Sequence, residues 1–355
     1  WASEPLCLLC LPLAHLSPCQ RAHVSPCPLA PSRFHRTITH MPQLTDRRSF
    51  LRTLAGATGA AAISVGCASR PTATRIVDTH THFYDPTRGQ GVPWPPKDSF
   101  LDRQVLPPDW QRVAAPHGIR ETVVVEASAW PQDNDWILRL ADDHPCIVGF
   151  VGNLRPADGT FAGNLRRLAA HPLFRGVRIP AGKLSAELTD PTFARHLSLL
   201  TDHGLALDIN GLGDFAGAVR LARSFPGLRI VVDHVGNVRD PAAPDQAWLE
   251  GMHRLGAEPN IYCKLSGLVE PVKTPHGAAP TNVAYYRPTL DHVTASFGPR
   301  RVFYGSNWPV SDKGARYADV FGLVADYYAE RTAEDRERFF WRNSLDAYRW
   351  VSRGA

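Results

Sequence analysis

Imidazole groups stand at the ends of short apolar segments of this sequence, where they could bind a metal ion or a substrate. His80 and His82 end the segment RIVDTHTH, two positions apart. Residues i and i+2 of a β-strand point to the same face, so these two side chains would lie together. Such a pair can ligate one metal ion or bind an anion. His234 ends the segment LRIVVDH and is a third candidate, whereas Asp233 should point to the opposite face, toward the packing helices.

Other polar residues end further apolar segments. Arg178 lies in GVRIP, where a guanidinium could hold a carboxylate or polarise a carbonyl through two hydrogen bonds, although a structural ion pair is the alternative. Lys264 in YCKLSG could bind a hydroxyl or a carboxylate, or could simply lie on the surface. Glu126 ends ETVVVEA and could accept hydrogen bonds from substrate hydroxyls, and Asn307 directly follows the last segment.

Eight apolar segments, mostly about 25 to 30 residues apart, could position these side chains. They alternate with amphipathic stretches, which predicts parallel strand–helix–strand units. Eight such units over residues 75–355 fit a single (β/α)8 TIM barrel of the α/β class, in which the carboxyl ends of the strands surround the active site. A doubly wound open sheet is the alternative, but it usually has a glycine-rich phosphate-binding turn after its first strand, where this chain has His-Thr-His.

Helix boundaries and two long loops complete the predicted barrel. Asp190, followed by proline, predicts the start of one helix, and Asp214 predicts the start of another. Thr332 with an aspartate three positions later resembles a capping box. The Pro- and Gly-rich residues 83–96 and the irregular residues 270–285 predict long loops after the first and seventh strands.

The charge of the chain is concentrated near its beginning. Of the 355 residues, 39 are basic and 34 acidic, which gives a net charge of +5. Residues 1–74 hold seven of the basic and two of the acidic residues, which leaves 32 of each in the rest. A balanced domain lacks the excess of Lys and Arg that nucleic-acid binding needs, so we expect no nucleic-acid partner. No apolar run is long enough for an ordinary transmembrane span.

Residues 1–74 are expected to lie outside the fold. Residues 1–40 lack periodicity and precede the first methionine, so we interpret them as an extension that is not native. Residues 41–74 have an arginine pair followed by Ser-Phe-Leu and an Ala/Gly-rich stretch, which predicts a twin-arginine signal segment and linker. The export machinery would then be a partner and the periplasm the destination. Cys67, after Val-Gly, is a candidate for a lipid anchor.

Six motifs give the chain a family resemblance. The segments VDTHTHFYDP, GVRIPAG, VVDHVGN, YCKLSGL, YGSNWPV and RNSLDAYRW occur in this order within residues 75–352. Together they resemble the amidohydrolase-related family of the amidohydrolase superfamily, in the branch that contains L-fuconolactonase, L-rhamnono-lactone hydrolases and 2-pyrone-4,6-dicarboxylate lactonase. The resemblance implies a TIM barrel and a hydrolase, with catalytic roles for His80, His82, Arg178, His234 and Asn307 and a site role for Lys264.

The sequence departs from this family at Asn307. Most relatives have an aspartate there, within GSDWP, which is the general base that activates water. An amide cannot take a proton from water at neutral pH. Another group is then the base, or Asn307 only positions water, or the catalytic step differs. Asp312 and His234 are the substitutes that the sequence offers.

The metal content stays open between two expectations. Binuclear relatives use a strand-4 Lys or Glu and a strand-5 His, which this chain lacks at the corresponding segments. We therefore expect either no metal or a single divalent ion, zinc, with His80, His82 and His234 as its ligands.

We expect the protein to hydrolyse a lactone or ester of a small sugar acid or carboxylic acid. Water would attack the carbonyl while His80, His82 and Arg178 polarise it. The residues expected to contact this small-molecule substrate are Tyr84, Trp94, Glu126, Lys264 and Trp308.

Two other functions remain open. One is a metal-dependent amidohydrolase or decarboxylase of the same superfamily, which tightly bound zinc would favour. The other is a non-catalytic periplasmic binding protein that has lost its base, which ligand binding without turnover would favour. Restored activity in Asn307→Asp would strengthen the second.

Overall fold

The computed structural model of the chain describes residues 75–274 and 277–354. The proposed extension (1–40), the signal segment (41–74) and the lipid-anchor candidate Cys67 lie outside the described residues. Export therefore stays a prediction. Within the described part, no helix has the length and apolar character needed to cross a membrane, and Cys146 and Cys263 are buried free thiols.

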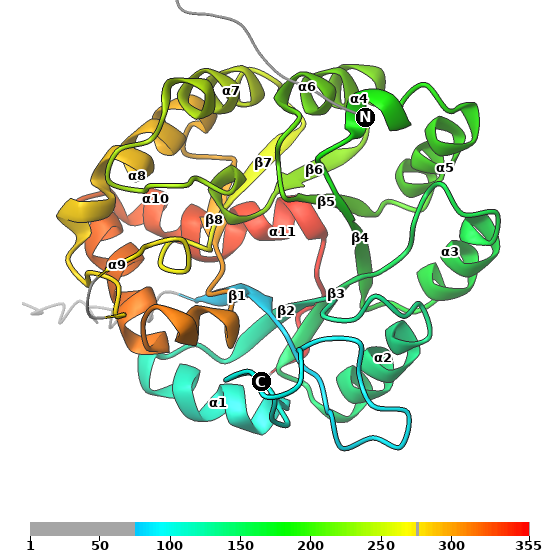
Figure 1. The fold of residues 1–355 in the computed structure, drawn as a ribbon, viewed down its shortest axis with the longest axis horizontal. Helices are drawn as coiled ribbons and strands as arrows, with labels where there is room; N and C mark the ends of the chain where they lie inside the picture. Colours follow the sequence, from blue (N-terminus) through cyan, green and yellow to red (C-terminus); the bar gives the residue numbers. More distant parts are fainter. Residues whose placement is uncertain (1–74, 275–276, 355) are drawn as a thin grey trace, which may run out of the picture. The chain divides into compact units, whose positions relative to one another are not determined.

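Eight parallel strands form one sheet in sequence order, which confirms the predicted barrel (Figure 1). The strands are β1 (Val77–Thr81), β2 (Glu121–Val125), β3 (Ile147–Gly152), β4 (Phe174–Pro180), β5 (Ala206–Asn210), β6 (Arg229–Val232), β7 (Ile261–Leu265) and β8 (Val302–Tyr304). Thr81 forms a parallel bridge with Trp308, and the His82 amide donates to the Trp308 carbonyl at 2.9 Å. These contacts bring the start of the sheet against the segment that follows its last strand.

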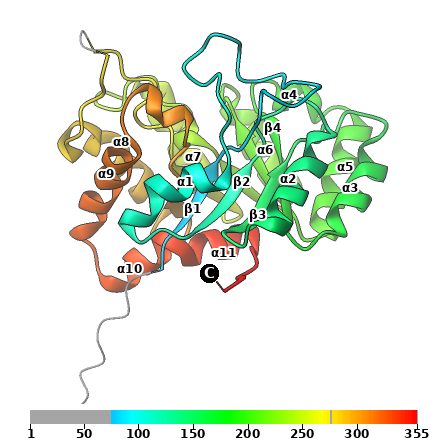
Figure 2. The same ribbon diagram turned by 90° about the horizontal axis from the view of Figure 1, so that it is seen from below.

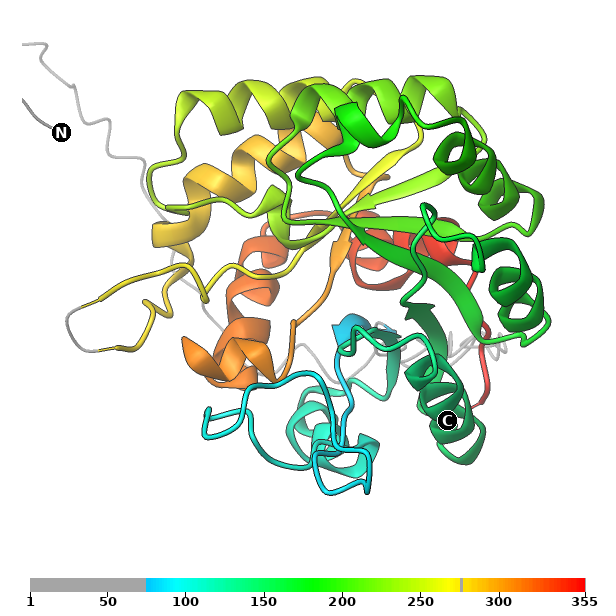
Figure 3. The same ribbon diagram turned by 45° about the vertical axis from the view of Figure 1, so that its right-hand side comes forward.

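Helices surround the strands, as Figures 1 and 3 show. They are α1 (Pro107–Ala114), α2 (Asp133–Asp143), α3 (Phe161–Ala169), α4 (Leu184–Glu187), α5 (Pro191–Asp202), α6 (Phe215–Ser224), α7 (Gln246–Gly256), α8 (Val283–Phe297), α9 (Tyr317–Ala329), α10 (Ala333–Glu337) and α11 (Asn343–Tyr348). Short helical turns add η1 (Ala115–His117), η2 (His234–Gly236), η3 (Val310–Lys313) and η4 (Arg338–Arg342).

The predicted helix starts are confirmed by their caps. The Asp190 carboxylate accepts from the backbone amide of Thr192 at the start of α5. Asp214 does the same for α6 by accepting from the amide of Gly217, and Thr332 begins α10. A cap of this kind stabilises a helix by about 1 kcal/mol because it pairs an amide that has no partner within the helix.

The two ends of the barrel differ. Helix α11 covers the end opposite the long loop after β1, which rises from the other end (Figure 2). Ala347 and Tyr348 of α11 join Val77, Val231 and other apolar strand residues in one buried cluster. The end with α11 is therefore sealed by packing, and the functional groups are left to the other end.

Candidate active site

A cavity of about 740 Å³ opens at the carboxyl ends of the strands. This volume is within the usual range for a site that encloses a small molecule. Six of the ten residues predicted for the site line it: His82, Trp94, Glu126, Arg178, His234 and Asn307. His80, Tyr84, Lys264 and Trp308 do not.

Lys264 lies beneath the cavity and is fully buried, which rules out the surface position. Its Nζ atom is 3.0 Å from Asp208 Oδ2 and 3.0 Å from Asp233 Oδ1. The same atom is 3.1 Å from His80 Nδ1. Buried charges are costly unless they are paired, so one ammonium group here compensates two carboxylates.

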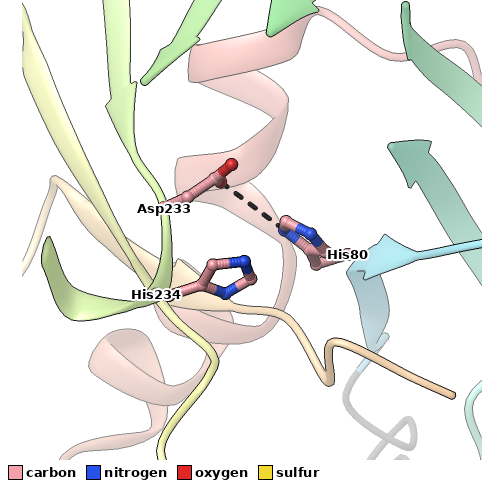
Figure 4. A group of neighbouring side chains, drawn as sticks. All are labelled: His80, Asp233 and His234. Atoms are coloured by element: carbon pink, nitrogen blue, oxygen red, sulfur yellow. Dashed lines mark ion pairs between the residues drawn. The ribbon is translucent and has the colours of Figure 1, made fainter. Parts of the chain in front are cut away.

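The predicted outward direction of Asp233 is wrong. The carboxylate is fully buried and lies 3.5 Å from His80 Nδ1 and 3.8 Å from Arg178 Nη1. Strand β6 ends at Val232, and His234 has a φ of 52°, in the left-handed region. Asp233 has extended backbone and lies two positions after Val231, which is in the buried cluster with α11, so it follows the alternation of the strand to the interior. The left-handed backbone of His234 turns the imidazole toward the same interior (Figure 4).

Asp208 extends the same charge network toward α11. The Tyr348 hydroxyl donates to Asp208 at 2.8 Å from Oδ2 and 3.0 Å from Oδ1. Burial raises the pKa of Asp208 above its ordinary value, although Lys264 opposes this. Burial would also raise the pKa of Asp233, but Lys264 and His80 hold it well below its usual range. Asp233 is therefore the carboxylate that stays charged.

Arg178 is a cation on the cavity wall that is held by carboxylates. Its Nε donates to Glu126 Oε1 at 2.8 Å, and its Nη2 donates to the Glu126 carbonyl at 2.7 Å. Burial would lower the pKa of Arg178, but Glu126 and Asp233 raise it. The two bonds to Glu126 fix the plane of the guanidinium, so Arg178 is held in place rather than free to follow a ligand.

His234 is oriented by the segment after β7. Its Nδ1 is 2.9 Å from Ser266 Oγ, and its ring centre is 4.5 Å from that of His80. Burial lowers the pKa of His234 to about 4, with Arg178 and Lys264 adding to the effect. Gly267 has a φ of +65°, and a Cβ there would be 2.6 Å from the Cβ of His234. Glycine at this position therefore allows the close approach of the imidazole.

His82, Asn307 and Glu270 form a line of hydrogen-bonding groups on the cavity wall. His82 Nδ1 donates to the Val125 carbonyl at 3.0 Å, and its Nε2 is 3.2 Å from Asn307 Oδ1. Asn307 Nδ2 donates to Glu270 Oε1 at 2.6 Å. Burial and the charge of Arg178 lower the pKa of His82 to about 3, while burial raises the pKa of Glu270.

Glu270 was missed by sequence reasoning, as was the role of Asp208. Glu270 begins the predicted loop 270–285, three positions after Gly267, on the side of the barrel where the active site was expected. A carboxylate at the start of this loop was the only feature of the sequence that could have indicated a role for Glu270 in the site. Asp78 was also missed: it accepts from the Ser306 amide at 2.8 Å and so fixes the segment that carries Asn307.

The remaining predicted residues have structural contacts. The Tyr84 hydroxyl donates to the Leu101 carbonyl at 3.0 Å, and Trp308 is buried. Asp312, offered as a substitute base, pairs with Arg103 at 3.2 Å and does not line the cavity. Of the two substitutes considered from the sequence, only His234 is in the site.

One set of side chains in the described part of the chain could hold a metal ion. His80, Asp233 and His234 offer ligand atoms that all lie within 4.8 Å of one another. His80 Nε2 is buried without a hydrogen-bond partner, and Asp233 Oδ2 has only Arg178 Nη1 near it, at 3.8 Å, so both atoms could accept an ion. Two imidazoles and a carboxylate suit a single divalent metal. Asp233 thus joins two of the three predicted ligands, while His82 faces Asn307.

Strand-end histidines, a fixed guanidinium and buried carboxylates around one cavity define a TIM-barrel protein of the amidohydrolase type. The chain belongs to the amidohydrolase family, whose model matches residues 77–350. It is similar to an L-fucono-1,5-lactonase of Burkholderia ambifaria, with 29% identity over 285 residues that cover 77% of this chain and 95% of the relative.

Solved structures agree with this assignment. An amidohydrolase from Burkholderia multivorans with bound zinc has 25% identity and a TM-score of 0.68, covering 78% of this chain and 99% of that one. A probable 2-pyrone-4,6-dicarboxylic acid hydrolase from Acinetobacter baumannii, with citric acid bound, has 18% identity and a TM-score of 0.61. It covers 77% of this chain and 98% of that one, and at this identity it shows a shared fold.

Proposed function

We propose that the protein hydrolyses a lactone of a sugar acid or of a related small carboxylic acid. The observation that carries this proposal is the placement of a fixed cation, Arg178, and a hydrogen-bonded carboxyl, Glu270, on the wall of one cavity. The similarity to an L-fucono-1,5-lactonase along nearly the whole length of that relative supports the same reaction class.

Arg178 would stabilise the charge that develops on the carbonyl oxygen when water attacks. A donor fixed in advance is worth more than a mobile one because it need not reorganise during the reaction. Glu126 supplies that fixation through its two bonds to the guanidinium. His234, which is neutral at physiological pH because burial lowers its pKa to about 4, would add a neutral imidazole at the same wall.

Two further arginines favour a substrate with a negative charge. Arg155 and Arg239 line the cavity, and neither forms an ion pair with the described residues, in contrast to Arg178. The carboxylate of a lactone that carries one could form an ion pair with these arginines. We therefore expect lactones of this kind to bind more tightly than neutral sugar lactones.

Zinc is the ion we propose for the set His80, Asp233 and His234, in line with the zinc in the Burkholderia multivorans relative. When bound, a divalent ion there would act as a Lewis acid toward a carbonyl oxygen. Lys264 lies 3.0 Å from Asp233 Oδ1, and its positive charge would weaken the binding of any cation. We expect zinc to bind loosely.

The test is proton release from a panel of lactones, measured with protein that starts near Arg75. The panel contains L-fucono-1,5-lactone, L-rhamnono-γ-lactone and 2-pyrone-4,6-dicarboxylate, each with and without a chelator. Turnover of any member supports the proposal, and the response to chelator decides whether the ion contributes. Binding of a lactone without turnover would contradict it and support a binding protein instead.

A further inference from the structure

Two carboxyl groups line the cavity, and their surroundings differ. Glu270 lines the cavity with Glu126. Glu126 is paired directly with Arg178 at 2.8 Å, whereas Glu270 has no ion-pair partner among the described residues. Its two oxygens accept from neutral donors, the Asn307 amide at 2.6 Å and the Val269 backbone amide at 3.1 Å. A carboxylate without a bound cation keeps its ability to take a proton.

The other titratable groups on the cavity wall are poorly suited to remove a proton from water. His82 has both ring nitrogens engaged, one by the Val125 carbonyl and the other by Asn307. His234 belongs to the set that could hold a metal ion, and its Nδ1 is bonded to Ser266 Oγ. Glu126 is held in an ion pair with Arg178, which makes its carboxylate a weaker acceptor for a proton. Arginines stay protonated and cannot act as bases. Glu270, whose pKa is raised by burial, is the remaining group.

The hydrogen bonds of Asn307 connect the protonation of its two neighbours. His82 Nδ1 must carry a hydrogen because it donates to a carbonyl. When the Asn307 oxygen faces His82, both contacts of Asn307 are hydrogen bonds only if His82 Nε2 carries a second proton. When the side-chain amide is reversed, its oxygen faces Glu270, and the contact is a hydrogen bond only if Glu270 is protonated. In the arrangement that the structure has, Asn307 Nδ2 donates to Glu270, so Glu270 is a carboxylate that can take a proton. In the reversed arrangement Glu270 carries that proton, so Asn307 can serve both states of the base.

We infer that Glu270 is the general base of this site and that Asn307 is the positioning residue that holds it. The inference rests on the proposed lactone hydrolysis. Ionised Glu270 takes a proton from water while the water oxygen bonds to the lactone carbonyl carbon. The ring C–O bond then breaks, and the departing oxygen takes the proton from Glu270. The product is a hydroxy acid, which releases one proton to solution when it ionises.

Charged groups near Glu270 are few, so its own ionisation should control the acid side of the pH profile. Those that face it are Lys313 on η3 and Tyr286 on α8. The other titratable groups elsewhere on the cavity wall are His82, Glu126, Arg155, Arg178, His234 and Arg239. Because the pKa of Glu270 is raised, activity should fall as the pH drops through a value above that of an ordinary glutamate, about 4.3.

The test compares Glu270→Gln with a matched control, Glu250→Gln, which changes an exposed glutamate on the outer helix α7. We expect Glu270→Gln to lower kcat by at least about 100-fold, the usual contribution of a general base, with a smaller change in KM. The acid limb of the pH profile should disappear. Glu270→Asp should recover part of the activity, Asn307→Ala should lose less than Glu270→Gln, and the control should match the wild type.

Wild-type kcat in a folded Glu270→Gln, or an unchanged acid limb, would overturn the inference. A second measurement separates this failure from failure of the proposed function. The side-chain carboxyl carbon of Glu270, labelled with ¹³C and assigned by its loss in Glu270→Gln, can be titrated without any substrate. A midpoint above that of an ordinary glutamate supports the inference, and a midpoint at or below it overturns the inference, even if no lactone in the panel is hydrolysed.

Discussion

Replacement of Lys264 by methionine should destabilise the barrel more than any other single change in the charge network. The ammonium is fully buried and lies 3.0 Å from a carboxylate oxygen on each of Asp208 and Asp233. Loss of one partner from a buried ion pair typically costs about 3 to 5 kcal/mol, because the other charge is left uncompensated. For a domain of this size such a loss lowers Tm by about 10 °C.

Unfolding in urea, followed by circular dichroism, would measure the effect. The control is Lys97→Met, which removes the charge of an exposed lysine and should change the free energy of unfolding by less than about 0.5 kcal/mol. The double variant Lys264→Met/Asp208→Asn should be more stable than Lys264→Met alone, because only one carboxylate then remains uncompensated. A loss below about 1 kcal/mol in Lys264→Met, or strictly additive effects in the double variant, would refute the reasoning.

Three further predictions concern the cavity. Glu270→Gln should raise Tm at pH 8. The pKa of Glu270 is raised in the folded state, so the ionised carboxylate lowers the stability of the fold at pH values above that pKa. The gain in Tm should vanish in thermal melts near pH 4, where Glu270 of the wild type is protonated. Arg178→Lys should lower kcat by about 100-fold at all pH values, because lysine cannot form both bonds to Glu126; steady-state kinetics that show an unchanged kcat would contradict this. Arg155→Gln and Arg239→Gln should each raise KM about tenfold for a lactone with a carboxylate and leave KM for a neutral lactone unchanged, and equal effects on both would argue against the charge preference.

The barrel and much of the site wall could be predicted because they depend on short-range patterns. The alternation of apolar and amphipathic segments indicates strands and helices, and a strand of known direction carries its last residues to a known end of the barrel. His82, Arg178 and Asn307 were found in this way.

The charge network could not be predicted from the same rules. The expected direction of Asp233 assumed that His234 faces inward as part of a regular strand. In the structure Asp233 follows Val231 to the interior, and the left-handed backbone of His234 turns the imidazole to the same side. The sequence alone left Lys264 either at the surface or in the site. Its burial depends on a contact with Asp208 of β5, which is 56 residues away along the chain. Glu270 lies in a loop, where no periodicity determines which way a side chain points.

The contact between Tyr348 and Asp208 has a consequence for how the chain is made. The two residues are separated by 140 positions, and a ribosome adds about 5 to 20 residues per second. Tyr348, which donates to Asp208, is therefore synthesised on the order of ten seconds after Asp208. Until α11 has emerged, the buried carboxylates lack one of their donors, and the end of the barrel that α11 covers stays open to water. The charge network beneath the active site is thus completed only when the last helix, α11, packs against the barrel. A nascent chain that lacks α11 should be cleaved by proteases more readily than the complete chain.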